Sequence, residues 1–201
     1  MINVTTSTNQ RVLQGDIVEN VEFIEEVVED QGRLLISKIV FPFCVILTQD
    51  CDLQQDYTFR QADKGSQDKY LISVLVAPLY NVEHFRTGDH LSNLKYRMNP
   101  KRWKNTEGTF IKNNQNPRYH YLEFPDTVQI PNSVVDFKHY FSSKITHLEK
   151  IKSHGSSWSM PELFREDLSQ RFASFMSRIG LPDLNKNQST PQPPSSVSKS
   201  Q

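Results

Sequence analysis

The chain has 201 residues, enough for one domain of ordinary size that folds around its own core without disulfides. Lysine plus arginine equals aspartate plus glutamate at 23 each, so the molecule has no net charge that would by itself attract nucleic acid or an anionic membrane. The N-terminus carries no apolar signal segment and no window approaches the length of a membrane span, so we expect a cytoplasmic protein without membrane contact.

The predicted fold is mainly β with some α. Residues 1–10 are polar and predicted to be flexible, and residues 11–142 are predicted to form one mainly β domain. Its first strand follows Gly15-Asp16, and six acids without a base between them, from Glu19 to Asp30, are predicted to form the solvated side of a strand or long loop. A strand buried on both faces is predicted at 43–47, followed by an exposed loop at 54–69.

A second apolar strand at 70–80, stopped by Pro78, is predicted to pair antiparallel with 43–48. Residues 81–118 are predicted to be a basic insertion in which aromatic residues alternate with bases. Such a pattern is typical of surfaces that stack bases and contact the backbone of single-stranded nucleic acid. The alternative is a solvated insertion that its aromatics pin to the domain. The predicted nucleic-acid-binding residues are Lys101, Arg102, Trp103, Lys104 and Arg118.

Further strands are predicted at 118–122 and 134–137, followed by a C-terminal helical region at 143–182. Within that region apolar residues recur every three or four positions from Glu162, which predicts an amphipathic helix that covers the sheet. Residues 183–201 have no apolar period and are predicted to be disordered.

Reactive side chains gather where the 43–47 strand ends, at Asp50, Cys51 and Asp52. One interpretation joins them to His120 as general acid or base, with Asp136 orienting the imidazole and Arg118 neutralising a phosphate. The same set would also fit a thiol-dependent hydrolase with Cys51 as nucleophile. The alternative is an Asx-type turn around a small buried cysteine. Because no Cys-x-x-Cys or His-x-x-x-His spacing is present, neither a metal nor another cofactor is predicted.

Three short motifs together resemble the PemK and MazF toxins of bacterial toxin–antitoxin systems. They are Gly15-Asp16-Ile17-Val18, the run from Pro42 to Leu47, and the run from Val74 to Leu79. The resemblance covers about residues 14–80 and implies an SH3-like barrel, usually dimeric, that cuts single-stranded RNA without a metal. The family's Arg before the strand proline is Phe41 here, and its Thr after the second proline is Leu79 or Tyr80. The family's catalytic residues are therefore not retained.

We therefore expect a PemK/MazF-like protein that binds single-stranded RNA in a prokaryotic toxin–antitoxin or phage-defence setting, with endoribonuclease activity as an open question. The resemblance implies an antitoxin or another defence-complex protein as a partner, and a homodimer. The alternative is a non-catalytic barrel module that mediates protein–protein interaction within a defence or stress complex.

Overall fold

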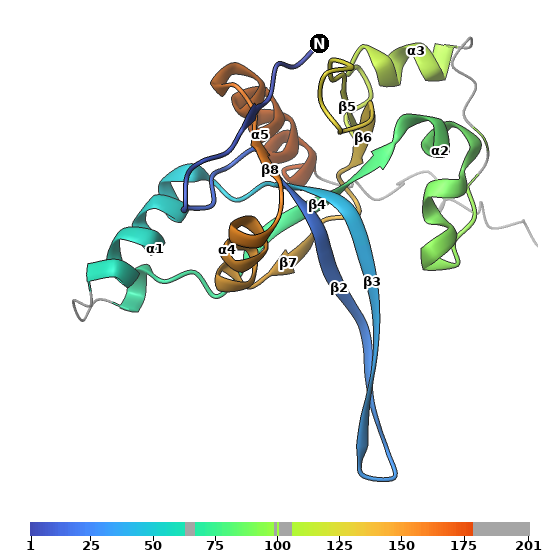
Figure 1. Cartoon of the computed structure of the whole chain (residues 1–201). Coiled ribbons are helices and arrows are strands. Elements are labelled where there is room, and N and C mark those ends of the chain that lie inside the picture. The colour runs from blue at the N-terminus through green and yellow to red at the C-terminus, as the bar shows by residue number, and fades with distance from the viewer. Residues whose placement is uncertain (63–66, 99, 101–105, 179–201) are drawn as a thin grey trace, which may run out of the picture.

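The computed structural model describes residues 1–62, 67–98, 100 and 106–178, which form a mainly antiparallel β-sheet surrounded by helices (Figure 1). Eight strands belong to the sheet, in the order β1-β8-β2-β3-β4-β6-β5, and β7 pairs with β4. The prediction that the fold is mainly β with some α is confirmed. Within the described residues the sheet is open, with β1 and β5 at its two ends. The strands are β1 Thr5–Thr6, β2 Asp16–Asp30, β3 Arg33–Ile46, β4 Val74–Asn81, β5 Tyr119–Leu122, β6 Ser133–Asp136, β7 Phe141–Ser143 and β8 Ser157–Ser159.

In the described part of the chain, five α-helices and two 3₁₀ turns connect and cover these strands. The α-helices are α1 Asp50–Ala62, α2 Val82–Thr87, α3 Thr106–Lys112, α4 Ile145–His154 and α5 Glu162–Met176, and the 3₁₀ turns are η1 Gln67–Lys69 and η2 Asp89–Leu94. Helix α5 confirms the amphipathic helix predicted from Glu162. Its Leu168, Phe172 and Phe175 are buried. The region 143–182 also contains β8, which pairs with β1 and β2.

The central strands are buried on both faces, as predicted for 43–47. Cys44 and Ile46 belong to one apolar cluster, whereas Val45 and Leu47 belong to a second cluster on the other side of the sheet. This division follows from the alternation of side chains along a strand. The predicted pairing with the second apolar strand is also confirmed, with Val45 opposite Ala77.

Two expectations for the middle of the chain are wrong. Pro78 does not stop its strand, because it lies inside β4 opposite Cys44. Most of the predicted loop at 54–69 is helical, in α1 and η1. Hydrophobic periodicity does not predict helix α1, because only Leu53 and Asp56 are buried along it. Its signal is electrostatic, with acids in the first turn and Arg60 in the last, an arrangement that the helix dipole favours.

Strands β2 and β3 continue far beyond the rest of the sheet as a two-stranded hairpin (Figure 1). The turn at its tip consists of Gln31 and Gly32, with φ of 49° and 75°. Left-handed conformations at both central residues are typical of a type I′ hairpin turn, whose twist matches that of the strands. Every residue from 24 to 38 is exposed, and we call this segment the arm.

Candidate functional site

The residues predicted to act at the end of the 43–47 strand lie in the first turn of α1. The Asp50 carboxylate accepts two hydrogen bonds of 3.1 Å from the Arg11 guanidinium and one of 3.2 Å from the Gln14 backbone. Partial burial would raise the pKa of Asp50, but these hydrogen bonds outweigh it and the pKa lies below its ordinary value. Asp50 therefore holds the N-terminal segment against α1. Cys51 is exposed, and its Sγ lies 3.6 Å from Gln49 Oε1 and 3.8 Å from Asp52 Oδ1.

His120 lies in β5 with only 2% of its surface exposed. Its Nδ1 accepts a hydrogen bond of 2.9 Å from Arg171 Nε on α5. Burial, with a smaller contribution from the Arg171 charge, lowers the pKa of His120 to about 3. The imidazole is therefore neutral at physiological pH and is enclosed between α5 and the sheet.

Asp136 does not contact His120. In the β5–β6 pairing Asp136 is opposite Tyr119, whereas His120 is opposite Val135, so the two side chains leave opposite faces. Asp136 is 1% exposed and accepts two hydrogen bonds from Arg118, of 2.8 and 2.5 Å. The predicted orientation of His120 by Asp136 is therefore not what the structure shows.

The predicted catalytic residues thus occupy two separate places. Figure 1 shows α1 and β5 on different sides of the molecule. Asp50, Cys51 and Asp52 are at the first, and His120 and Asp136 are at the second. Of the predicted nucleic-acid-binding residues, only Arg118 is in the described part of the chain. Lys101, Arg102, Trp103 and Lys104 lie outside the described residues.

The ion pair of Arg118 and Asp136 belongs to a cluster that also contains His139 and Tyr80. The sequence analysis did not predict this cluster. His139 Nε2 lies 3.7 Å from Asp136 Oδ2, and its Nδ1 is 3.1 Å from the Tyr80 hydroxyl. Burial lowers the pKa of His139, although the Asp136 charge counteracts this in part. Burial likewise raises the pKa of Tyr80, with the Asp136 charge adding to the effect. At neutral pH the cluster therefore contains a neutral imidazole and a neutral phenol beside a compensated ion pair.

Two members of this cluster, Tyr80 and His139, line a cavity of about 190 Å³, which we call the aromatic cavity. Six of its nine lining residues are aromatic, two are the bases Lys138 and His139, and none is an acid. The lining residues are Phe23, Phe41, Tyr80, Leu94, Tyr96, Lys138, His139, Tyr140 and Phe141. They come from the base of the β2–β3 hairpin, from β4, from the η2 region, from the segment between β6 and β7, and from β7 itself.

The lining of the aromatic cavity includes one exposed cation, and two more flank a lining residue in the sequence. Tyr96 is 62% exposed, and its neighbours Lys95 and Arg97 are also exposed, as is Lys138. Lys138 and His139 come two and three residues after the end of β6 and directly follow the strand predicted at 134–137, so a polar turn after a predicted buried strand was the signal that could have identified them. An apolar space lined by aromatic rings can hold a planar ring while a nearby cation contacts a negatively charged group.

A larger cavity of about 470 Å³ shares Phe41, Tyr80 and Leu94 with the aromatic cavity. His90 lines it, and the His90 ring is 4.7 Å from the Tyr80 ring. Neither ring nitrogen of His90 is exposed, and neither has a hydrogen-bond partner of good geometry among the described residues, although the His84 carbonyl is near enough to favour the protonated ring. Burial is the main cause that lowers the pKa of His90 to about 4.

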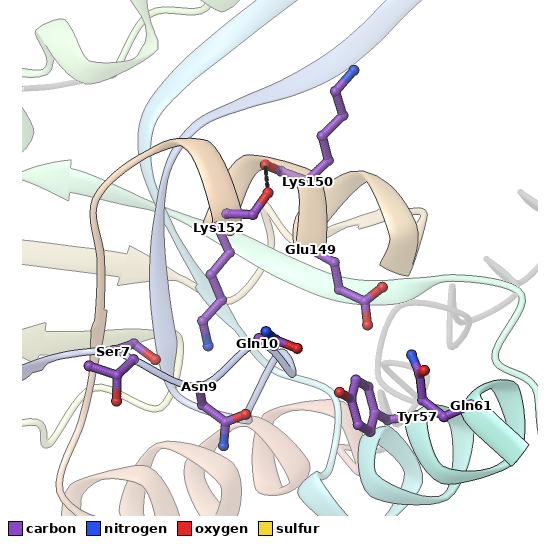
Figure 2. A pocket seen from close by; sticks show the side chains of 10 residues that line it. Ser7, Asn9, Gln10, Tyr57, Gln61, Glu149, Lys150 and Lys152 are labelled. Carbon is purple, nitrogen blue, oxygen red and sulfur yellow. Dashed lines mark hydrogen bonds between the residues drawn. The ribbon is translucent and has the colours of Figure 1, made fainter.

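A third hollow, of about 590 Å³, lies between the N-terminal segment, α1 and α4 (Figure 2). It is polar, but two of its charged groups are already engaged. Glu149 accepts hydrogen bonds of 3.1 and 2.6 Å from Arg60, and the Lys152 amine binds Asp16. Lys150 points away from Tyr57 and Gln61 in Figure 2. The arrangement is that of a polar contact between elements.

Across the described residues, no group of three His, Cys, Asp or Glu side chains is placed to hold a metal ion. No helix in that part of the chain is long and apolar enough to cross a membrane.

Comparison with known proteins gives no relative. No family model matches the chain, and neither a curated protein nor a solved structure is significantly similar to it. The function of the aromatic cavity has to be inferred from its own residues.

Proposed function

We propose that this protein binds single-stranded RNA, with a base in the aromatic cavity and phosphates on the nearby cations. The observation that carries the proposal is the composition of the cavity, in which six aromatic side chains and two bases meet without an acid. In a protein with zero net charge, attraction for a polyanion has to be local. Lys95, Arg97 and Lys138 are exposed and provide such a local positive field.

Each partner in this arrangement contributes a different part of the binding free energy. Stacking of a base on an aromatic side chain is worth about 1–3 kcal/mol and does not depend strongly on base identity. The contacts from lysine and arginine to phosphate release counterions, so they make the affinity fall as salt rises. Because Asp136 already neutralises Arg118, we assign phosphate binding to Lys95, Arg97 and Lys138 rather than to Arg118.

Cleavage of the bound strand is a further part of the proposal, motivated by the position of His139. Its side chain is 20% exposed, and its lowered pKa leaves the imidazole able to accept a proton at neutral pH. Lys138 is the nearby cation that would stabilise charge on a phosphate in the transition state. His139 and Lys138 would then take the place of the catalytic Arg and Thr of PemK/MazF toxins, which this chain lacks. The SH3-like barrel and the toxin–antitoxin or phage-defence setting are proposed on the sequence resemblance alone.

A second candidate function is that of a non-catalytic module for protein–protein interaction within a defence or stress complex. The observation that favours it is the arm, which exposes both apolar and acidic side chains far from the body of the protein. A module of this kind would keep its cellular activity when His139 is replaced by alanine, whereas a ribonuclease would lose it.

Binding of a labelled single-stranded RNA of mixed sequence, followed by fluorescence anisotropy at increasing salt, tests the main proposal. We expect Lys138→Gln and Tyr96→Ala each to weaken binding several-fold, and Lys138→Gln to reduce the dependence of log K on log salt by about 0.7. Lys150→Gln on α4 removes the same charge from an exposed position away from the cavity, and it should leave binding unchanged. Absence of salt-dependent binding, or an equal loss in Lys150→Gln, would overturn the proposal.

A further inference from the structure

The arm exposes several large apolar side chains. All fifteen residues from 24 to 38 are exposed, and six of them are large and apolar. Leu34 is 69% exposed, and Leu35 and Ile36 are 55% and 58% exposed. The six residues are Ile24, Val27, Val28, Leu34, Leu35 and Ile36. Contiguous exposed apolar residues of this kind mark an interaction surface.

The backbone of the arm is also incompletely paired. Strand β3 pairs with β4 only through Cys44–Ile46, so its outer edge from residue 33 to 43 has no strand beside it within the described part of the chain. A two-stranded ribbon is marginally stable alone, and three or more strands are needed for independent stability. An open edge of this length is a template for pairing with another strand.

The two edges of the arm differ in charge. Strand β3 from Arg33 to Ile46 contains no acid, and its exposed part has Leu34, Leu35 and Ile36 in succession between two bases, Arg33 and Lys38. All four acids of the arm, at positions 25, 26, 29 and 30, belong to β2. Charged side chains on an edge strand oppose addition of a further strand, and along the arm β2 carries four of them whereas β3 carries two. The β3 edge of the arm is therefore less protected against pairing than the β2 edge.

We propose that the β3 edge of the arm pairs antiparallel with the same edge of a second copy of this chain, with the two-fold axis at Leu35. Leu35 then lies opposite its own copy, and Leu34 lies opposite Ile36 on each side. Val28 is the partner of Leu35 in the hairpin. One face of the four-stranded sheet therefore carries a row of four side chains across the strands: Val28 and Leu35 of one copy, then Leu35 and Val28 of the other. This row is entirely apolar.

A second copy fits this edge better than an unrelated partner because the edge is complementary to itself. A two-fold interface requires one patch to match itself, and the Leu34-Leu35-Ile36 run does so when it is paired antiparallel about its centre. The acids of both copies are then on the two outer strands, where they remain solvated and prevent a third copy from adding. This inference does not depend on RNA binding at the aromatic cavity.

Two matched variants test whether the copies associate through the β3 edge of the arm or through one of its faces. Leu35→Lys places two like charges opposite each other at the proposed axis, whereas Val28→Lys places the same charge on the same face but on the outer strand. We expect the full chain to sediment as a dimer at about 100 µM, in the range where interfaces of modest size associate. Leu35→Lys should raise the dimer dissociation constant at least tenfold, and Val28→Lys should leave it within about twofold. Circular dichroism confirms that each variant is folded.

Cysteine cross-linking gives the register directly. In a background with Cys51→Ser, Leu35→Cys should form an intermolecular disulfide under mild oxidation, because residues opposite each other in an antiparallel pair are within disulfide distance. Val28→Cys should not form one. A wild-type chain that remains monomeric, a dimer weakened equally by both lysine variants, or cross-linking through position 28 instead of 35 would each overturn the proposal.

Discussion

Lys152 and Asp16 form an ion pair whose side chains are 2% and 0% exposed, with 2.5 Å between Nζ and Oδ2. The pair joins α4 to the start of β2. Lys152 also donates to the Arg11 carbonyl, and Asp16 accepts from the Leu13 backbone and the Ser159 hydroxyl. The aspartate of the Gly15-Asp16-Ile17-Val18 motif is thus part of a buried polar network that fixes the strand.

Replacement of Lys152 by Met should reduce the free energy of unfolding by about 3–5 kcal/mol, because Asp16 would remain buried and charged without its partner. Chemical denaturation measures this loss. Lys150→Met, at an exposed position of the same helix, should change stability by less than about 0.5 kcal/mol. Equal effects of the two substitutions would show that the buried pair contributes nothing specific.

Stability should fall as the pH decreases below about 6.5, and His120 should account for part of this fall. The folded protein holds the pKa of His120 at about 3, whereas the unfolded chain protonates it near the ordinary value of 6.5. Between these two values the unfolded state binds more protons, so protonation favours unfolding and stability rises with pH. His90, with its pKa lowered to about 4, contributes in the same direction.

Denaturation measured from pH 7 to pH 4 tests this linkage. His120→Gln should make stability less dependent on pH over that interval, because one titrating group is removed. The exposed His84 is the control, and His84→Gln should leave the pH dependence as it is in the wild type. An unchanged slope in His120→Gln would contradict the burial of a neutral imidazole at this position.

Substitution of Arg171 should reduce the free energy of unfolding more than substitution of most other residues of α5. Its guanidinium donates to the carbonyls of Asn114, Asn116 and Tyr119 in addition to His120. Arg171→Met would remove the guanidinium from these partly buried acceptors, of which the Asn116 carbonyl keeps a hydrogen bond from the Tyr119 backbone, and we expect a loss of about 2 kcal/mol or more in the free energy of unfolding. Met keeps much of the apolar length of the side chain. A loss below about 0.5 kcal/mol would show that water replaces the guanidinium without cost.

Two glycines separate the cost of a left-handed backbone from the cost of a clash. Gly15 has φ of +76°, and an added Cβ would lie 2.9 Å from Arg165 Cγ, whereas Gly32 has φ of +75° with nothing within 4 Å. Gly32→Ala should cost about 1–2 kcal/mol of local arm stability, measured by amide hydrogen exchange. Gly15→Ala should cost more in global denaturation, and Arg165→Ala should recover part of the difference. If Gly15→Ala and Gly32→Ala cost the same and Arg165→Ala recovers nothing, a clash at Gly15 makes no contribution.

The elements that the sequence predicts well are those whose signal is local. The run from Phe43 to Leu47 is apolar throughout, which indicates a strand with both faces covered, and the period from Leu163 to Phe175 indicates α5. Helix α1 was missed because it is polar and is stabilised by charges at its ends. Its residues from 54 to 62 read as a loop when hydrophobicity alone is considered.

The candidate site was predictable only in part because its contacts join distant segments. Arg118 was predicted to neutralise a phosphate and Asp136 to orient His120, whereas the structure pairs the two with each other. His139 and Tyr80 meet only because the segment after β6 returns to β4, and no spacing in the chain reveals this contact. Conversely, Asp50 and Cys51 are adjacent to reactive neighbours in sequence, yet Asp50 is engaged by Arg11.

Cross-linking of RNA that contains 4-thiouridine, with the attached peptides identified by mass spectrometry, tests the central claim most directly. If RNA binds as we propose, cross-links will occur at residues of the aromatic cavity, with Tyr96 and Tyr80 as the principal positions, and Lys138→Gln will reduce their yield. Cross-links confined to the arm or to α4, or a yield that Lys138→Gln does not change, would contradict binding at this cavity.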